Sequence, residues 1–127
     1  MNDLVADASA IVALLVGEKF DGFDPADLNG TLISSVNLAE VLTRLPELGV
    51  PEHVAEAALA ELNLRVIAFD EAQAHITARL RPATRHAGLS LGDRACLSLA
   101  TMMKCPAVTA DRVWTGIDVG VPIVLIR

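Results

Sequence analysis

Aromatic side chains are almost absent from this 127-residue sequence, which has one Trp, three Phe and no Tyr. Proteins that bind single-stranded nucleic acid by base stacking need exposed aromatic rings, so the composition disfavours that mode of recognition. Cysteine is also rare. Cys96 and Cys105 have neither the paired spacing of a metal site nor the Cys-x-x-Cys spacing of a redox site. We expect both to be core thiols in a reducing cytoplasm.

Long apolar runs are missing as well. No stretch reaches the roughly 20 residues that a membrane helix needs, and no basic leader precedes a short apolar segment. We therefore expect a cytoplasmic protein with no membrane partner. With 127 residues, 53% of them hydrophobic, the chain has the size of one domain. We expect residues 1–127 to form a single domain with an aliphatic core.

A general excess of positive charge is the third absence. The net charge is −6, which gives no overall electrostatic footprint for nucleic acid. The charge is uneven, because residues 1–61 carry eleven acids and two bases whereas residues 62–127 carry five acids and eight bases. Four bases fall within sixteen residues: Arg79, Arg81, Arg85 and Arg94. Nucleic-acid binding would need such a local patch or a metal, although charge alone favours an ordinary solvated helix face.

Apolar strands alternate with helical segments along the whole chain. Short strands are expected at residues 4–7, 31–34, 65–69, 106–109 and 122–126. Helices are expected at residues 10–16, 36–45, 51–62, 71–87 and 92–103. Ser35 is placed to cap the second helix, Pro46 to end or bend it, and Pro82 to kink or split the fourth. This alternation predicts an α/β fold, a three-layer α/β/α sandwich around a parallel sheet of about five strands.

The first apolar run, residues 4–6, ends on Asp7 and is followed at once by a helix. Open α/β sheets form their sites in the crevice beyond the carboxyl ends of the strands, so we expect Asp7 to lie there. Three more acids point to the same rim. Glu40 lies in mid-helix, Asp93 opens another helix, and Asp111 follows the fourth strand. Strands one and four are neighbours if the sheet reverses its winding in the usual way.

Each acid also has a local structural explanation. Asp7 can cap the helix that follows, Glu40 can pair with Arg44 one turn later, and Asp93 and Asp111 can form caps or turns. Four acids on one rim favour a shared chemical role instead. Carboxylates without His or Cys suit Mg²⁺ or Mn²⁺. Such ions support phosphoryl chemistry by activating water and clamping the oxygens of an in-line displacement.

The motifs around these acids resemble the PIN-domain ribonucleases, above all the VapC toxins of bacterial toxin–antitoxin pairs. Asp7 stands in V-A-D-A-S-A, Glu40 in S-S-V-N-L-A-E-V, Asp93 in L-S-L-G-D-R-A-C-L-S-L-A and Asp111 in V-T-A-D-R-V-W. The resemblance covers essentially the whole chain. It implies the sheet order 3-2-1-4-5 and a metal-dependent endoribonuclease in which the four acids hold Mg²⁺ or Mn²⁺ and cleave RNA.

The same resemblance implies a VapB-like antitoxin as partner, together with a homodimer and a toxin–antitoxin hetero-oligomer. The extended tail of the antitoxin would lie along the helices beside the crevice, with apolar side chains in the grooves between helices. The negative balance of residues 1–61 favours a basic ligand at this surface.

Four further residues are weaker candidates. The hydroxyls of Ser9 and Thr109 can orient metal-bound water, or merely cap a helix and end a strand. Asn37 lies one helical turn before the acid of the second helix and can support it. Arg94 can counter the charge of the acid beside it or touch a phosphate. Trp114 is expected only to pack.

Other protein classes fit parts of the pattern. A phosphoacceptor receiver domain would use Asp70 as acceptor and Thr109 as switch hydroxyl. That class needs two adjacent acids after the first strand and a lysine after the fifth, which the sequence lacks. A haloacid-dehalogenase-type phosphatase needs a second acid two residues after Asp7, where Ser9 stands. A catalytically silent binding module is the third alternative, and metal-dependent cleavage of RNA distinguishes it from the enzyme.

Overall fold

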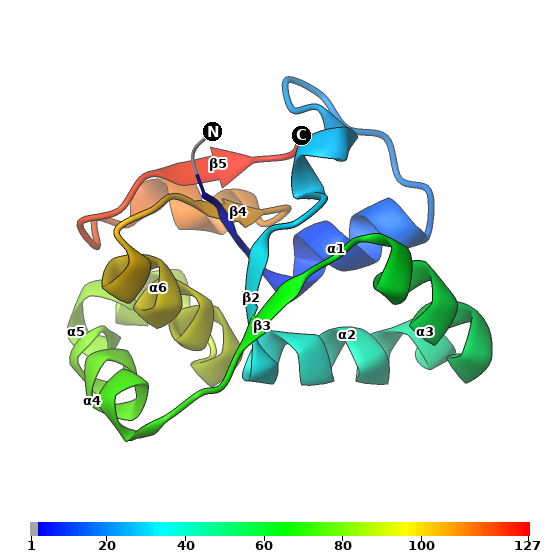
Figure 1. The fold of residues 1–127 in the computed structure, drawn as a ribbon. Coiled ribbons are helices and arrows are strands. Elements are labelled where there is room, and N and C mark those ends of the chain that lie inside the picture. The colour runs from blue at the N-terminus through cyan, green and yellow to red at the C-terminus, as the bar shows by residue number, and fades with distance from the viewer. Residues whose placement is uncertain (1–2) are drawn as a thin grey trace.

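The computed structural model describes residues 3–127. Its five strands form one parallel sheet in the order β3-β2-β1-β4-β5 (Figure 1). The strands are β1 Val5–Ala6, β2 Leu32–Ser34, β3 Arg65–Ile67, β4 Ala107–Thr109 and β5 Ile123–Leu125. The predicted fold class and strand order are confirmed, and every strand lies within its expected segment.

Six helices and three short 3₁₀ turns connect the strands. The helices are α1 Ala8–Leu15, α2 Ser35–Glu47, α3 Glu52–Glu61, α4 Glu71–Arg79, α5 Arg81–Thr84 and α6 Leu91–Met103. The 3₁₀ turns are η1 Pro25–Leu28, η2 Arg85–Ala87 and η3 Arg112–Gly116. The split expected at Pro82 is confirmed, because α4 and α5 are separate helices. Within residues 3–127, no helix has both the length and the apolar character needed to cross a bilayer.

Two details of α2 correct the prediction. Its cap is Ser34, whose Oγ accepts from the N–H of Val36 at 3.2 Å. Ser35 is already helical, and its Oγ accepts from the N–H of Phe69 at 3.0 Å, which ties α2 to the end of β3. The helix also continues past Pro46 to Glu47, because a proline in the last turn removes one hydrogen bond without stopping the helix.

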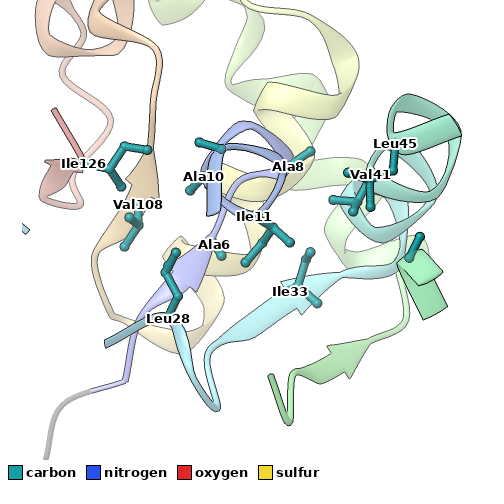
Figure 2. Packing of buried hydrophobic residues seen from close by; sticks show 12 residues of the cluster. Ala6, Ala8, Ala10, Ile11, Leu28, Ile33, Val41, Leu45, Val108 and Ile126 are labelled. Atoms are coloured by element: carbon teal, nitrogen blue, oxygen red, sulfur yellow. The ribbon is translucent and has the colours of Figure 1, made fainter. Parts of the chain in front are cut away.

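Helices cover both faces of the sheet (Figure 1). On one face, Ile11 of α1 and Val41 of α2 pack against Ile33 and Val108 (Figure 2). On the other face, α6 packs its buried side chains against the sheet, and the cluster there includes Cys96 and Trp114. Cys96 and Cys105 are buried free thiols, as expected, and Trp114 is buried in the core as predicted.

Strand β1 lies at the centre of the sheet and pairs with both β2 and β4. Val5 is the register partner of Leu32 on one side and Ala107 on the other. Val5 and Ala6 are fully buried in the two different core clusters, so a slip of one residue would exchange the two faces. The N–H of Asp7 then donates to the carbonyl of Val108 at 2.8 Å. This bond fixes the carboxyl end of β1 beside the end of β4, as predicted.

Candidate active site

Asp7 is a buried carboxylate at the carboxyl end of β1, with 4% of its surface exposed. It occupies the N-cap position of α1, but its side chain makes no capping hydrogen bond. Its Oδ2 instead accepts from Ser9 Oγ at 2.7 Å and from Thr109 Oγ1 at 3.0 Å. The capping explanation therefore does not account for this side chain.

Ser9 and Thr109 are held in place by backbone N–H groups as well. Ser9 Oγ accepts from the N–H of Ala110 at 3.0 Å, and Thr109 Oγ1 accepts from the N–H of Asp111 at 3.1 Å. Each hydroxyl has a single proton, and donating it to Asp7 leaves the oxygen free to accept these bonds. The hydroxyls thus join Asp7 to the loop that carries Asp111, so neither is merely the end of a helix or strand.

Glu40 reaches the same region from the middle of α2. Its Oε1 accepts from Asn37 Nδ2 at 2.8 Å, and the same amide group donates to the carbonyl of Gly92 at 3.0 Å. Asn37 is fully buried, so this bridge ties α2 to the start of α6. The alternative partner of Glu40, Arg44, pairs with Glu47 instead, at 3.7 Å.

The backbone of α6 approaches the Glu40 carboxylate closely at Gly92. A Cβ atom at this position would lie 2.5 and 2.6 Å from the two carboxylate oxygens, closer than real Cβ contacts come. No side chain larger than hydrogen fits there while Glu40 keeps its position. The sequence motifs did not predict the contact between Glu40 and Gly92, because these residues belong to two separate helices.

Asp93 and Asp111 both make the local caps that were considered as alternatives. Asp93 forms a capping box with Ser90: its Oδ2 accepts from the N–H of Ser90 at 2.9 Å, and Ser90 Oγ accepts from the N–H of Asp93 at 3.1 Å. Asp111 Oδ1 accepts from the N–H of Val113 at 3.0 Å and begins η3. Each cap uses one carboxylate oxygen. Within residues 3–127, Oδ1 of Asp93 and Oδ2 of Asp111 have no hydrogen-bond partner.

The negative charges of two other acids act on Asp7. The pKa of Asp7 is raised to about 6, mainly by burial and in smaller part by the negative charges of Asp93 and Glu40, while the hydrogen bonds from Ser9 and Thr109 oppose the rise. Burial also raises the pKa of the Cys96 thiol, with added effects from Asp7, Asp93 and Glu40. These three carboxylates therefore share one neighbourhood. Asp111 is linked to it through Thr109.

The donor chemistry of this neighbourhood fits a hard divalent cation. Asp7, Glu40, Asp93 and Asp111 offer only oxygen, which Mg²⁺ and Mn²⁺ prefer. A buried carboxylate beside two like charges is unfavourable unless a cation compensates it. In the described part of the chain, no three His, Cys, Asp or Glu side chains are already spaced as ligands of one ion. Mg²⁺ commonly keeps several waters and takes only one or two carboxylates directly, so a partly assembled donor set suits it.

Arg94 and Asp70 make other contacts than the roles considered for them would require. Arg94 Nη1 donates to the carbonyl of Thr77 on α4 at 3.0 Å, and no ion pair joins Arg94 to Asp93 within residues 3–127. Asp70 caps α4, with Oδ1 accepting from the N–H of Gln73 at 3.0 Å. It follows β3 at the edge of the sheet, and the observed strand order differs from the 2-1-3-4-5 order of receiver proteins. The receiver alternative is therefore not supported.

A groove of about 980 Å³ runs between α1 and α2 and reaches one of the four acids, Glu40. Its apolar lining includes Val12, Val16 and Ala39, and Ser9 and Glu40 also border it. The family resemblance implied grooves between the helices beside the crevice, but the sequence did not indicate which helices would form one. Val16, at the end of α1, is exposed, and it belongs to the face that the rest of the fold leaves uncovered.

Comparison with known families gives one match over most of the chain. The family model described as "PIN domain" matches residues 4–119. No curated protein matches the chain.

Several solved structures share the fold. VapBC2 from Rickettsia felis, bound to a DNA fragment from its promoter, has a TM-score of 0.73 and 17% identity, with 96% of this chain and 97% of that chain covered. DNA-bound VapBC from Salmonella typhimurium has a TM-score of 0.71 and 20% identity, with 100% of both chains covered. VapC20 from Mycobacterium tuberculosis, described as a sarcin-ricin loop cleaving toxin, has a TM-score of 0.67 and 15% identity, with 91% and 97% covered. At these identities the likeness is one of fold.

Proposed function

The chain belongs to the PIN-domain family, and we propose that it is a metal-dependent endoribonuclease, the toxin of a toxin–antitoxin pair. One observation carries the proposal. Asp7 is buried with two hydroxyls on one carboxylate oxygen, and the charges of Glu40 and Asp93 act on it. Such a cluster is costly unless it serves to hold a cation.

We propose Asp7, Glu40, Asp93 and Asp111 as both the metal-holding and the catalytic residues. A bound Mg²⁺ or Mn²⁺ would supply electrophilic activation for hydrolysis of an RNA phosphodiester. The protein's own contribution is to fix the oxygens beforehand. Ser9 and Thr109 hold Asp7, Asn37 holds Glu40, and the two caps hold Asp93 and Asp111. Preorganised donors of this kind lower the barrier because they need not reorient during the reaction.

The chemistry is tested with purified protein and a labelled RNA. Cleavage is expected to vanish in chelator and return with Mg²⁺ or Mn²⁺, and the products should carry 5′-phosphate and 3′-hydroxyl ends. Cyclic phosphate ends would indicate attack by the RNA's own 2′-hydroxyl and would contradict the mechanism. Unchanged cleavage in chelator would contradict it equally. A chain that binds RNA without cleaving it under any metal condition would be a silent binding module.

The proposed partner is a VapB-like antitoxin, and the proposed assembly is a homodimer within a toxin–antitoxin hetero-oligomer in the cytoplasm. The similar VapBC structures support this partner class. The groove between α1 and α2 has an apolar lining and is bordered by Glu40. We propose that the tail of the antitoxin binds in this groove. Expression of this chain alone should slow growth, and co-expression of a small neighbouring reading frame should restore it. A harmless chain with its four acids intact would remove the toxin assignment and leave the nuclease proposal standing.

A further inference from the structure

Four of the ten Lys and Arg residues of this acidic protein are exposed on elements that contact one another in turn, and we call them the arginine surface. It comprises four exposed arginines at the end of α4, in α5, in η2 and in η3: Arg79, Arg81, Arg85 and Arg112. No Asp or Glu occurs between Ala72 and Gly92, so the one acid of the helical segment that carries three of them is Glu71, at the start of α4 and two turns before Arg79.

These four arginines differ from the other exposed arginines in their surroundings. Arg44, Arg65 and Arg127 each form an ion pair with a carboxylate. Within residues 3–127, none of the four arginines of the arginine surface does. Their charges are therefore available to an external anion, which an ordinary surface of alternating, paired charges does not offer.

One end of the arginine surface adjoins Asp93 across a single peptide group. Arg81 Nη1 donates to the carbonyl of Leu89 at 3.3 Å. The N–H of the same peptide group, that of Ser90, donates to Asp93 Oδ2 at 2.9 Å. In a trans peptide the carbonyl and the N–H point in opposite directions. The guanidinium and the carboxylate therefore lie on opposite sides of one peptide, close to the start of α6.

The other end of the arginine surface adjoins Asp111. Turn η2 packs against η3, and His86 Nε2 lies 3.3 Å from the carbonyl oxygen of Gly116. Arg112 follows Asp111 directly and opens η3. Arg85 and Arg112 are thus carried by two turns in contact with each other. The arginine surface reaches the candidate site at two of its four acids.

We infer that the arginine surface binds the backbone phosphates of an RNA strand and leads that strand to the four acids. This inference rests on the proposed function and adds where the substrate lies. Arginine suits phosphate because its planar fork donates two parallel hydrogen bonds. The only Trp, Trp114, is fully buried in η3, so this surface offers no indole ring on which a base could stack. Binding is therefore expected to depend on phosphates and salt rather than on base sequence.

The inference is tested on the full-length protein in chelator, where cleavage is prevented and binding alone is measured. A single-stranded RNA with a fluorescent 5′ label is titrated by anisotropy over a series of salt concentrations. The triple variant Arg79→Gln/Arg81→Gln/Arg85→Gln should bind on the order of tenfold more weakly at about 0.1 M salt. Its plot of log K against log salt should be shallower by about 2, because each phosphate contact with a single strand contributes about 0.7.

A matched control removes the same charge elsewhere. The triple variant Lys19→Gln/Arg65→Gln/Lys104→Gln changes exposed bases that lie outside the arginine surface, and it should keep the wild-type affinity and slope. Equal losses in the two triple variants would mean that net charge alone matters and would overturn the inference. Melting curves and light scattering accompany both. A change of oligomeric state in the arginine variant with unchanged RNA binding would assign the surface to contact with a second copy of this acidic chain, and would also overturn the inference.

Cleavage assays with metal separate this inference from the proposed function. The arginine variant should raise KM for RNA with kcat little changed, because ground-state and transition-state binding are lost together. Normal cleavage by both triple variants with the wild-type KM would refute the arginine surface and leave the nuclease intact. Arginine-dependent RNA binding by a wild-type protein that never cleaves would refute the nuclease and leave the surface intact.

Discussion

The carboxylate of Glu40 occupies the space that a side chain at Gly92 would need, at a contact between α2 and the start of α6. The two carboxylate oxygens would lie 2.5 and 2.6 Å from a Cβ at that position. Asn37 completes the contact by donating from one amide group to both Glu40 and the carbonyl of Gly92. The position of a proposed catalytic acid thus depends on the absence of a side chain in another helix.

Substituting Gly92 by Ala should therefore reduce cleavage without harming the fold. Ala favours a helix by up to about 1 kcal/mol over Gly, and the displaced group is the flexible end of Glu40, so the melting temperature should hold or rise. Moving a catalytic group by about 1 Å can cost on the order of 100-fold in rate. Gly116→Ala, which meets nothing within 4 Å, is the control. In a Glu40→Ala background, Gly92→Ala should have no further effect; an additional loss there would show that it acts by another route.

Asp7 should destabilise the metal-free protein at neutral pH. Burial raises the pKa of Asp7 to about 6, whereas the unfolded value is about 3.9. Between these values the folded protein binds more protons than the unfolded chain, so stability falls as pH rises from about 4 to about 6 and is level above that. The total is about 3 kcal/mol. Melting temperatures of wild type and Asp7→Asn in chelator should diverge over this window, in favour of the variant. A difference in melting temperature that does not depend on pH would contradict the prediction.

Removing the hydroxyl of Thr109 should extend to higher pH the range over which the stability falls. The hydrogen bond from Thr109 lowers the pKa of Asp7, so Thr109→Val, which keeps the shape of the side chain, should raise it. The single variant Thr109→Val is compared with the double variant Asp7→Asn/Thr109→Val. Relative to the double variant, the stability of the single variant should still fall above pH 6. Thr115→Val, at an exposed hydroxyl in η3, is the control for loss of a threonine hydroxyl. An unchanged window would mean that Thr109 does not act on Asp7.

The two capping acids allow their structural and chemical roles to be separated. Asn preserves the cap, so Asp93→Asn and Asp111→Asn should unfold in urea within about 0.5 kcal/mol of wild type, whereas Ala should cost about 1 kcal/mol. If the charge serves the reaction, the Asn variants should nonetheless lose cleavage on the order of 100-fold. Full cleavage in both Asn variants would leave these acids with capping as their only role.

Much of the fold was predictable because its signals are local. Short apolar runs mark the five strands, with Gly30, Pro106 and Pro122 at the start of three of them, and Pro82 marks the split between α4 and α5. The strand order was a different matter. It came from the resemblance to a family, since periodicity does not say which strands pair. The cap of α2 was misplaced by one residue because Ser34 and Ser35 are both capping residues, and only the bond from the N–H of Phe69 to Ser35 decides between them.

The sequence indicated which residues to propose for the site, and it did not indicate how they are arranged. Sequence spacing indicated four acids at one rim. It did not show that Asp93 and Asp111 each use one carboxylate oxygen to accept a capping hydrogen bond. Nor did it show that Arg94 turns away to α4. These outcomes depend on contacts between elements far apart in the chain. A pattern within one helix carries no information about the backbone that will approach it from another.

The bond between Asp7 and Thr109 spans 102 positions of sequence, and this separation has a consequence for synthesis. On the ribosome, Asp7 emerges 102 residues before Thr109 of β4, its strand partner. Until then β1 lacks one neighbour, Ser9 lacks the N–H of Ala110, and the fourth acid has not been translated. A prematurely terminated product is therefore incapable of assembling the rim. For a protein proposed to attack RNA in the cell that makes it, this topology confines any activity to chains synthesised beyond Asp111, because contacts of such long range form late in folding.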